Sequence, residues 1–158
     1  MCRNLYPPSE GWPLHTSVCP VPGRRSDASL PKRVAMPKDT RTPIRNITVL
    51  GNYLPRRCGI ATYTTDLCEA IAQSYPTIPV TALAMNDTAE GYAYPDRVRF
   101  ELAQQALRAY QRAADFINRS NTDLVSVQHE YGIFGGPSGS HLLALLRDLR
   151  VPIVTTLH

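Results

Sequence analysis

The stretch that decides the fold is Asp123-Leu-Val-Ser-Val-Gln-His-Glu-Tyr-Gly-Ile-Phe-Gly-Gly-Pro137. It begins as a short apolar run, typical of a buried strand, and changes abruptly to a histidine, an acid and a glycine turn. Open sheets of parallel strands bind ligands beyond the carboxyl ends of their strands. The change therefore predicts a strand over residues 123–128 that ends in a polar site containing His129 and Glu130.

The same pattern recurs through residues 46–158, where short apolar runs alternate with longer amphipathic segments. Strands are predicted at residues 47–50, 79–85, 98–102, 123–128 and 151–157. Helices are predicted from residue 60 to near Pro76, over 106–117 and over 138–149. This alternation predicts a Rossmann-like α/β domain, whose mainly parallel sheet carries helices on both faces and right-handed crossovers.

Residues 1–45 differ in composition from the rest of the chain. They hold 8 of the 14 prolines and 8 of the 17 basic residues, and they show neither a helical nor an alternating apolar period. We therefore expect a disordered, basic tail, followed by one domain over residues 46–158. Met36 is a second plausible start of the protein besides Met1.

Charge, hydropathy and cysteine spacing argue against several classes of function. Residues 46–158 carry 9 basic against 10 acidic residues, which removes most of the electrostatic argument for binding nucleic acid. Neither a membrane-spanning run nor a secretory signal is found, so a cytoplasmic protein is expected. The four cysteines are scattered without metal-ligand spacing, which argues against a disulfide framework or a zinc site.

The first predicted strand leads through the loop Gly51-Asn-Tyr-Leu-Pro-Arg-Arg-Cys-Gly59 directly into a helix. Unpaired N–H groups at a helix N-terminus attract anions, and Arg56 and Arg57 add positive charge. We therefore expect a diphosphate or an acidic substrate to bind near Arg57 and Gly59. The alternative is that Gly59 only permits a tight turn and the arginines are solvated, because the loop matches neither Gly-x-Gly-x-x-Gly nor Gly-x-x-x-x-Gly-Lys-Ser/Thr.

His129 and Glu130 do not form the zinc motif His-Glu-x-x-His, because position 133 is Ile. No metal is therefore expected. An imidazole can instead accept a proton or bind a hydroxyl, and a carboxylate beside it can orient a sugar hydroxyl or the imidazole. The alternative is that both side chains only satisfy backbone groups of the loop.

Two further positions are expected at the same edge of the sheet. Gly135 and Gly136 precede Pro137 at the start of a predicted helix, where a second anion or hydroxyl contact can form. An ordinary junction between a loop and a helix explains them equally well. His158 ends the last predicted strand, and a histidine there can face the same crevice as His129.

Three strings resemble, in the same order, the N-terminal half of bacterial family 4 glycosyltransferases. They are Gly51-Asn-Tyr-Leu-Pro-Arg-Arg-Cys-Gly-Ile-Ala-Thr-Tyr-Thr-Thr-Asp-Leu67, Gln128-His-Glu-Tyr-Gly-Ile-Phe-Gly-Gly136 and Val151-Pro-Ile-Val-Thr-Thr-Leu-His158. The resemblance covers residues 45–158, which is all of the predicted domain. The first two strings are fairly specific, whereas the third is common to many parallel sheets.

That family is built from two Rossmann-like domains facing each other across a cleft, the GT-B fold. The resemblance implies that the N-terminal domain mostly holds the acceptor, a small molecule or a glycan. A nucleotide-sugar, which is a donor substrate and not a cofactor, is then held mostly by the C-terminal domain. The resemblance also implies that Cys58 and Gly59 approach the donor phosphates or the acceptor, that His158 lies near the transferred sugar, and that His129 and Glu130 line the acceptor side.

The chain resembles only the first of these two domains, and the family's donor-binding motif of two glutamates separated by seven residues is missing. Breaking a glycosyl phosphate bond requires stabilisation of the departing diphosphate and a positioned acceptor hydroxyl. Half a cleft cannot supply both. We therefore expect the acceptor-side half of a retaining glycosyltransferase, truncated or split, and inactive by itself.

Two other functions stay open. A small nucleotide-binding oxidoreductase fits the alternating strands and helices, but the dinucleotide fingerprint is missing and Met85-Asn86 places no acid at the end of the second strand. A non-catalytic binding module, or a half-protein that pairs in trans with a separate C-terminal domain, belongs to a different class.

Overall fold

The computed structural model describes residues 43–158. Residues 1–42, which form nearly all of the predicted tail and include Met1 and Met36, lie outside the described residues. The strands are β1 (Ile47–Gly51), β2 (Val80–Asn86), β3 (Val98–Ala103), β4 (Leu124–His129) and β5 (Ile153–Leu157). The helices are α1 (Gly59–Ser74), α2 (Leu107–Arg119) and α3 (His141–Asp148), with a 3-10 turn, η1 (Pro137–Gly139), before α3.

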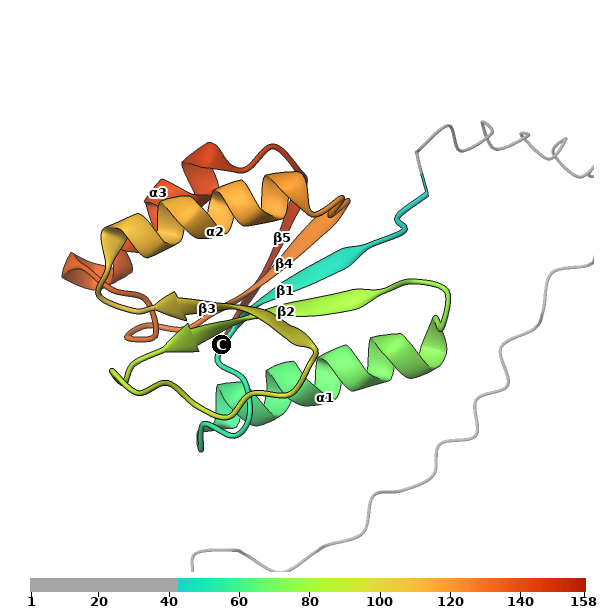
Figure 1. Cartoon of the computed structure of the whole chain (residues 1–158), viewed down its shortest axis with the longest axis horizontal. Helices are drawn as coiled ribbons and strands as arrows, with labels where there is room; N and C mark the ends of the chain where they lie inside the picture. The colour runs from blue at the N-terminus through green and yellow to red at the C-terminus, as the bar shows by residue number, and fades with distance from the viewer. Residues whose placement is uncertain (1–42) are drawn as a thin grey trace, which may run out of the picture. The chain divides into compact units, whose positions relative to one another are not determined.

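All five strands pair in parallel, in the order β3-β2-β1-β4-β5. Figure 1 shows α1 on one face of this sheet and α2 and α3 on the other. The prediction of a Rossmann-like α/β fold with helices on both faces is therefore confirmed. Among the described residues, no helix is both long and apolar enough to cross a lipid bilayer.

Successive residues of the inner strands are buried on opposite faces, which explains why these strands read as nearly continuous apolar runs. Leu50, Leu83 and Leu102 belong to the core on the face of α2 and α3. Val49, Ala82 and Cys68 belong to the core beneath α1. No helix joins β2 to β3; the connecting segment 87–97 runs on the α1 side instead, and its Tyr94 packs against the core there (Figure 1).

The predicted element bounds fail at the start of α3. The helix was expected from Ser138 but begins at His141. Ser138 has φ 52°, and Gly136 and Gly139 on either side have φ 78° and 76°, so the chain passes through left-handed conformations that cannot continue an α-helix. The strand β5 likewise begins at Ile153 and not at Val151.

Tyr110 of α2 joins two loops at the edge of the sheet. Its side chain is fully buried, its hydroxyl donates to the carbonyl of Gln104 over 2.8 Å, and it accepts from the N–H of Gly135 over 2.8 Å. Burial raises the pKa of Tyr110 above its usual value. The hydroxyl therefore stays neutral, as both donor and acceptor, at physiological pH.

We predict that Tyr110→Phe lowers the free energy of unfolding by about 1–3 kcal/mol, because the buried N–H of Gly135 loses its partner. Urea denaturation of the variant and of Tyr75→Phe, which alters a ring that is 58% exposed, measures the difference. Equal stabilities of the two variants would contradict the role assigned to the Tyr110 hydroxyl.

Candidate functional site

The carboxyl ends of all five strands meet at one edge of the sheet. The order of the strands reverses between β1 and β4, and open α/β sheets bind their ligands at such a reversal. The first residue after each strand is polar, and these five residues are Asn52, Asp87, Gln104, Glu130 and His158. This edge is therefore the candidate site.

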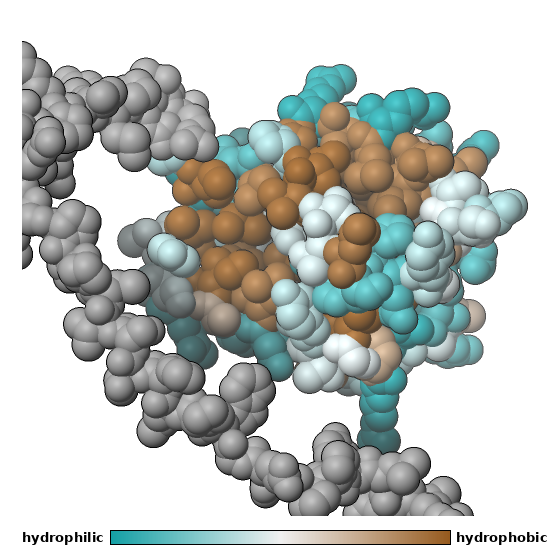
Figure 2. All heavy atoms as spheres, turned by 180° about the vertical axis from the view of Figure 1, so that it is seen from behind, coloured by the Kyte–Doolittle hydropathy of each residue, from teal (hydrophilic) through white to brown (hydrophobic). Residues whose placement is uncertain are grey.

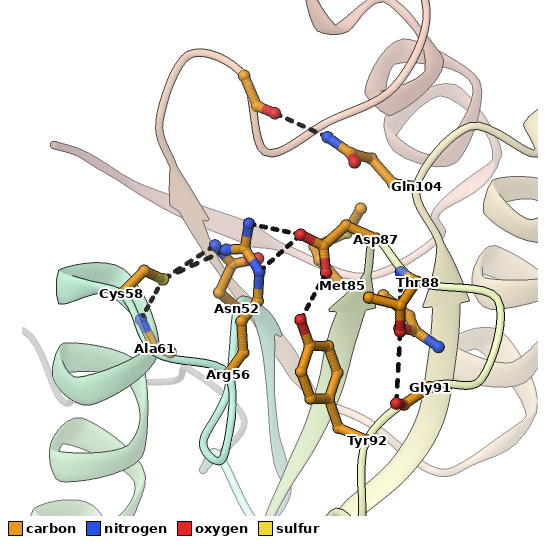
Figure 3. Close-up of polar contacts among 12 residues, drawn as sticks. Asn52, Arg56, Cys58, Ala61, Met85, Asp87, Thr88, Gly91, Tyr92 and Gln104 are labelled. Carbon is orange, nitrogen blue, oxygen red and sulfur yellow. Dashed lines mark hydrogen bonds and ion pairs between the residues drawn. The ribbon is translucent and has the colours of Figure 1, made fainter.

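Cys58 forms the N-cap of α1, with extended backbone angles of φ −156° and ψ 160°. Its sulfur accepts hydrogen bonds from the N–H of Ala61 (3.3 Å), from Nη1 of Arg56 (3.2 Å) and from Nδ2 of Asn52 (3.3 Å) (Figure 3). Asn52 is itself buried. Cys58 thus fixes the start of the helix and the loop that precedes it.

Arg56 links the loop after β1 to the loop after β2. Its Nη2 and Nε donate to Oδ2 of Asp87 over 2.9 and 3.1 Å, and the hydroxyl of Tyr92 donates to Oδ1 over 2.9 Å (Figure 3). The hydrogen bonds from Arg56 are the largest cause that holds the pKa of Asp87 below its usual value. Arg56 was expected to attract an anion, but its guanidinium is already engaged in this pair.

The N-terminus of α1 keeps two backbone donors. The N–H of Ala61 bonds to the sulfur of Cys58 and that of Thr62 to its carbonyl, whereas those of Gly59 and Ile60 have no partner among the described residues. Gly59 is exposed, and a Cβ there would meet no atom within 4 Å. Arg57 is exposed beside them and forms no ion pair within residues 43–158. These three positions can hold an anion.

His158 lies against the first turns of α1. Its Nε2 is 3.1 Å from Oε1 of Gln128, and its ring meets that of Tyr63 edge to face at 4.9 Å. The amide nitrogen of buried Gln128 donates to Ser126, so its oxygen is the acceptor and Nε2 of His158 is the donor. In the neutral imidazole, Nδ1 then remains as an acceptor.

The side chain of His129 lies on the opposite face of the sheet. Its ring packs at 5.6 Å on Phe134 and at 5.8 Å on Tyr131, on the side covered by α2 and α3. The main chains of the two histidines are hydrogen bonded: the N–H of His158 donates to the carbonyl of His129 over 2.9 Å. The structure therefore places both at one edge but does not bring their imidazoles together.

The side chains of His129 and Glu130 form no hydrogen bond with other residues in the described range. Neither one satisfies a backbone group of the loop, which was the alternative to a functional role. Both are only partly buried, so they remain accessible to a ligand at the end of β4.

Gly135 and Gly136 are tightly packed within the protein. A Cβ on Gly135 would lie 1.9 Å from the carbonyl oxygen of Gln104, and one on Gly136 would lie 2.5 Å from the ring of His141. Their N–H groups donate to Tyr110 and to Oε1 of Gln105. Close packing therefore explains both glycines, and their expected contact with a substrate stays a prediction.

A shallow hollow of about 380 Å³ lies at the carboxyl ends of β2 and β3. It is lined by Asn86, Asp87, Thr88, Ala103, Gln104, Gln105 and Ala106. We did not expect this hollow from the sequence. β2 ends with Met85-Asn86, and the acid Asp87 is the first residue after the strand. The pairing of Asp87 with Arg56 nevertheless occupies this carboxylate.

A comparison with models of known protein families and with curated proteins finds no match for this chain. The resemblance to family 4 glycosyltransferases thus depends on the three sequence strings alone. Within residues 43–158, no three His, Cys, Asp or Glu side chains gather as a group that could hold a metal ion.

Asp87 stabilises the fold above the unfolded carboxyl pKa of about 3.9, because its folded-state pKa is depressed, and this stabilisation is lost as the pH falls through the folded-state value. We predict that Arg56→Gln raises the pKa of Asp87 and costs at most about 1 kcal/mol at neutral pH. An NMR titration of the Asp87 carboxyl carbon measures this pKa. Arg57→Gln, the matched control, leaves it unchanged; an equal shift in both variants would contradict the pair.

We predict that Gly135→Ala lowers the free energy of unfolding by about 1–3 kcal/mol, because its Cβ would collide with the backbone at Gln104. Gly59→Ala is the control: there is space for a Cβ, and we expect a change below about 1 kcal/mol. Thermal unfolding of the two variants measures the difference. An unfolding temperature of Gly135→Ala equal to that of Gly59→Ala would contradict the predicted collision.

Proposed function

We propose that this chain is the acceptor-side half of a retaining glycosyltransferase, which acts in the cytoplasm on a nucleotide-sugar. The observation that carries the proposal is that the N–H groups of Gly59 and Ile60, which have no partner within residues 43–158, begin the same helix whose Tyr63 contacts the ring of His158, beside the reversal of strand order. The three sequence strings that resemble family 4 glycosyltransferases support it independently.

In this proposal the diphosphate of the donor binds at the N-terminus of α1. Two backbone N–H groups point out of the helix there, the helix dipole favours negative charge, and Arg57 adds an exposed positive charge. These groups stabilise the charge that develops on the diphosphate as the glycosyl bond breaks. Cys58 positions them as the N-cap of the helix.

His158 is oriented for contact with the transferred sugar. Its Nε2 hydrogen bonds to Gln128 and its ring rests on Tyr63, so Nδ1 is left to accept a hydrogen bond from a sugar hydroxyl. The ring of His129 lies on the other face of the same edge, and Glu130 directly follows β4; both would bind hydroxyls of a small-molecule or glycan acceptor. No nucleic acid takes part.

The size of these effects explains why we expect no catalysis by this half alone. A charge at a helix N-terminus is stabilised by about 0.3–1 kcal/mol, or about 2 kcal/mol in favourable geometry. Enzymes lower activation barriers by roughly 8–23 kcal/mol. One helix end and an arginine therefore fall far short, and the nucleotide-sugar needs a second domain, in cis or in trans, to complete the site.

A non-catalytic binding module is the second candidate. It is favoured by the opposite orientations of His129 and His158, which leave no pair of imidazoles in position to act on one substrate atom. A module of this kind would bind the same sugar ligands but would not support transfer when a donor-binding domain is added.

We predict that inorganic pyrophosphate shifts the amide NMR signals of Gly59 and Ile60 in the ¹⁵N-labelled chain, because their N–H groups have no partner in the described part of the chain. Arg57→Gln weakens this binding several-fold, whereas Arg108→Gln, which removes an exposed arginine from α2, does not. The chain alone transfers no sugar from UDP-glucose. Unshifted signals at the start of α1, equal effects of the two variants, or robust transfer would each contradict the proposal.

A further inference from the structure

A shallow groove with an aromatic floor lies between β3 and α2. It consists of two open hollows of about 440 Å³ and 510 Å³, which share Arg112 of α2. Phe116 lines one hollow and Phe100 lines the other, and the two rings meet at 5.4 Å, so the hollows are continuous. Both rings are only partly buried. Their apolar faces are therefore within reach of a ligand.

A β-bulge in β3 brings Phe100 to this groove. Ala82 and Leu83 are neighbours on β2, but they pair with Val98 and Phe100, so Arg99 is an extra residue without a partner on β2. In a regular strand Val98 and Phe100 would lie on the same face of the sheet. Instead, Val98 packs against the core beneath α1 and Phe100 against the core beneath α2. The bulge therefore turns Phe100 toward α2 and leaves Arg99 exposed at the edge of the sheet.

Three exposed arginines line the groove, namely Arg99, Arg112 and Arg119. None of them forms an ion pair with another residue of the described part of the chain. Arg112 and Arg119 lie on the same face of α2, about 10 Å apart along the helix axis. The guanidinium groups can therefore bind anionic groups that are spaced along a ligand. Figure 2 shows that the side of the molecule where β5 lies has a broad apolar surface instead.

Two acids, Glu101 and Asp115, alternate with these arginines along the groove. A partner with a negative charge on every unit, such as nucleic acid or an anionic lipid surface, would bring like charges close to these carboxylates. Carboxylates accept hydrogen bonds from hydroxyl groups. The groove therefore suits a ligand in which anionic groups are separated by hydroxyls.

The N-terminal segment of the chain has the wrong charge to occupy this groove. Residues 1–42 hold 7 basic against 3 acidic residues, so their net charge has the same sign as that of the three arginines. An external ligand with negative charge fits the groove better.

We propose that this groove binds an acidic oligosaccharide, a chain of sugars that carries carboxylates on some of its rings. The apolar faces of the sugar rings pack on the two phenylalanines, the sugar carboxylates pair with the three arginines, and sugar hydroxyls donate to the two acids. Because the groove is open, the sugar chain lies along the surface and is not enclosed by it.

This groove is separate from the candidate site at the start of α1. It extends to Ser120, which follows α2 and precedes β4 and therefore lies near the amino end of that strand. The candidate site lies at the opposite, carboxyl ends of the strands. Binding in the groove would hold a glycan on the surface without acting on it chemically. It goes beyond the proposed glycosyltransferase function and does not rest on it.

The test is an NMR titration of the ¹⁵N-labelled 158-residue chain with a hexamer of galacturonic acid at low salt. We expect the amide signals of Arg99, Arg112 and Arg119 to shift. Arg112→Gln removes the arginine common to both hollows and is expected to weaken binding at least about fivefold. Arg108→Gln is the matched control: Arg108 is exposed on the same helix but lines neither hollow, and its loss leaves the affinity unchanged.

Further probes distinguish a glycan from other anions. Phe116→Leu keeps the charge of the groove but removes one ring, and we expect it to weaken binding of the galacturonic acid hexamer several-fold, with the amide signals outside the groove unchanged. A neutral hexamer of glucose is expected to bind at least about tenfold more weakly. Equal binding of a hexaglutamate peptide or of single-stranded DNA would overturn the proposal. So would unshifted groove signals, equal effects of Arg112→Gln and Arg108→Gln, or full affinity in Phe116→Leu.

Discussion

The placement of β1 between β2 and β4 determines where the other elements lie. Both neighbours pair with it in parallel, so each connection between strands must cross back along a face of the sheet. The helix α1 crosses on one face, and α2 and α3 cross on the other (Figure 1). The close approach at Gly51 makes this possible, because a Cβ there would lie 3.0 Å from Gln128 and 3.2 Å from Thr64 of α1. The helix N-terminus consequently reaches the end of β4 and, beyond it, His158.

Most of the fold could be predicted from the sequence. Strands buried on two faces read as continuous apolar runs, and each helix has an apolar period, so the five strands, three helices and parallel sheet all followed from pattern. The start of α3 could not be predicted in this way. Ser138 adopts a left-handed conformation that non-glycine residues seldom take and that no local sequence pattern indicates. No helix lies between β2 and β3, and the only sign of this in the sequence is that residues 87–97 have no helical apolar period.

The candidate site was predictable in position but not in detail. Topology places the ends of β1, β4 and β5 together, and this was sufficient to select Gly59, Glu130 and His158. The faces on which the two histidines lie depend on the register of β4 and β5, which periodicity does not reveal. The ion pair between Arg56 and Asp87 joins two irregular loops 31 residues apart. The sequence does not indicate which of the adjacent residues Arg56 and Arg57 forms an ion pair.

We propose that a donor diphosphate binds at the start of α1, next to His158. The decisive measurement is a crystal structure of the chain with a bound nucleoside diphosphate sugar. We expect phosphate oxygens within hydrogen-bonding distance of the N–H groups of Gly59 and Ile60, with the sugar near Nδ1 of His158. A ligand bound instead in the hollow at the ends of β2 and β3, with the α1 N-terminus in contact with solvent alone, would contradict it.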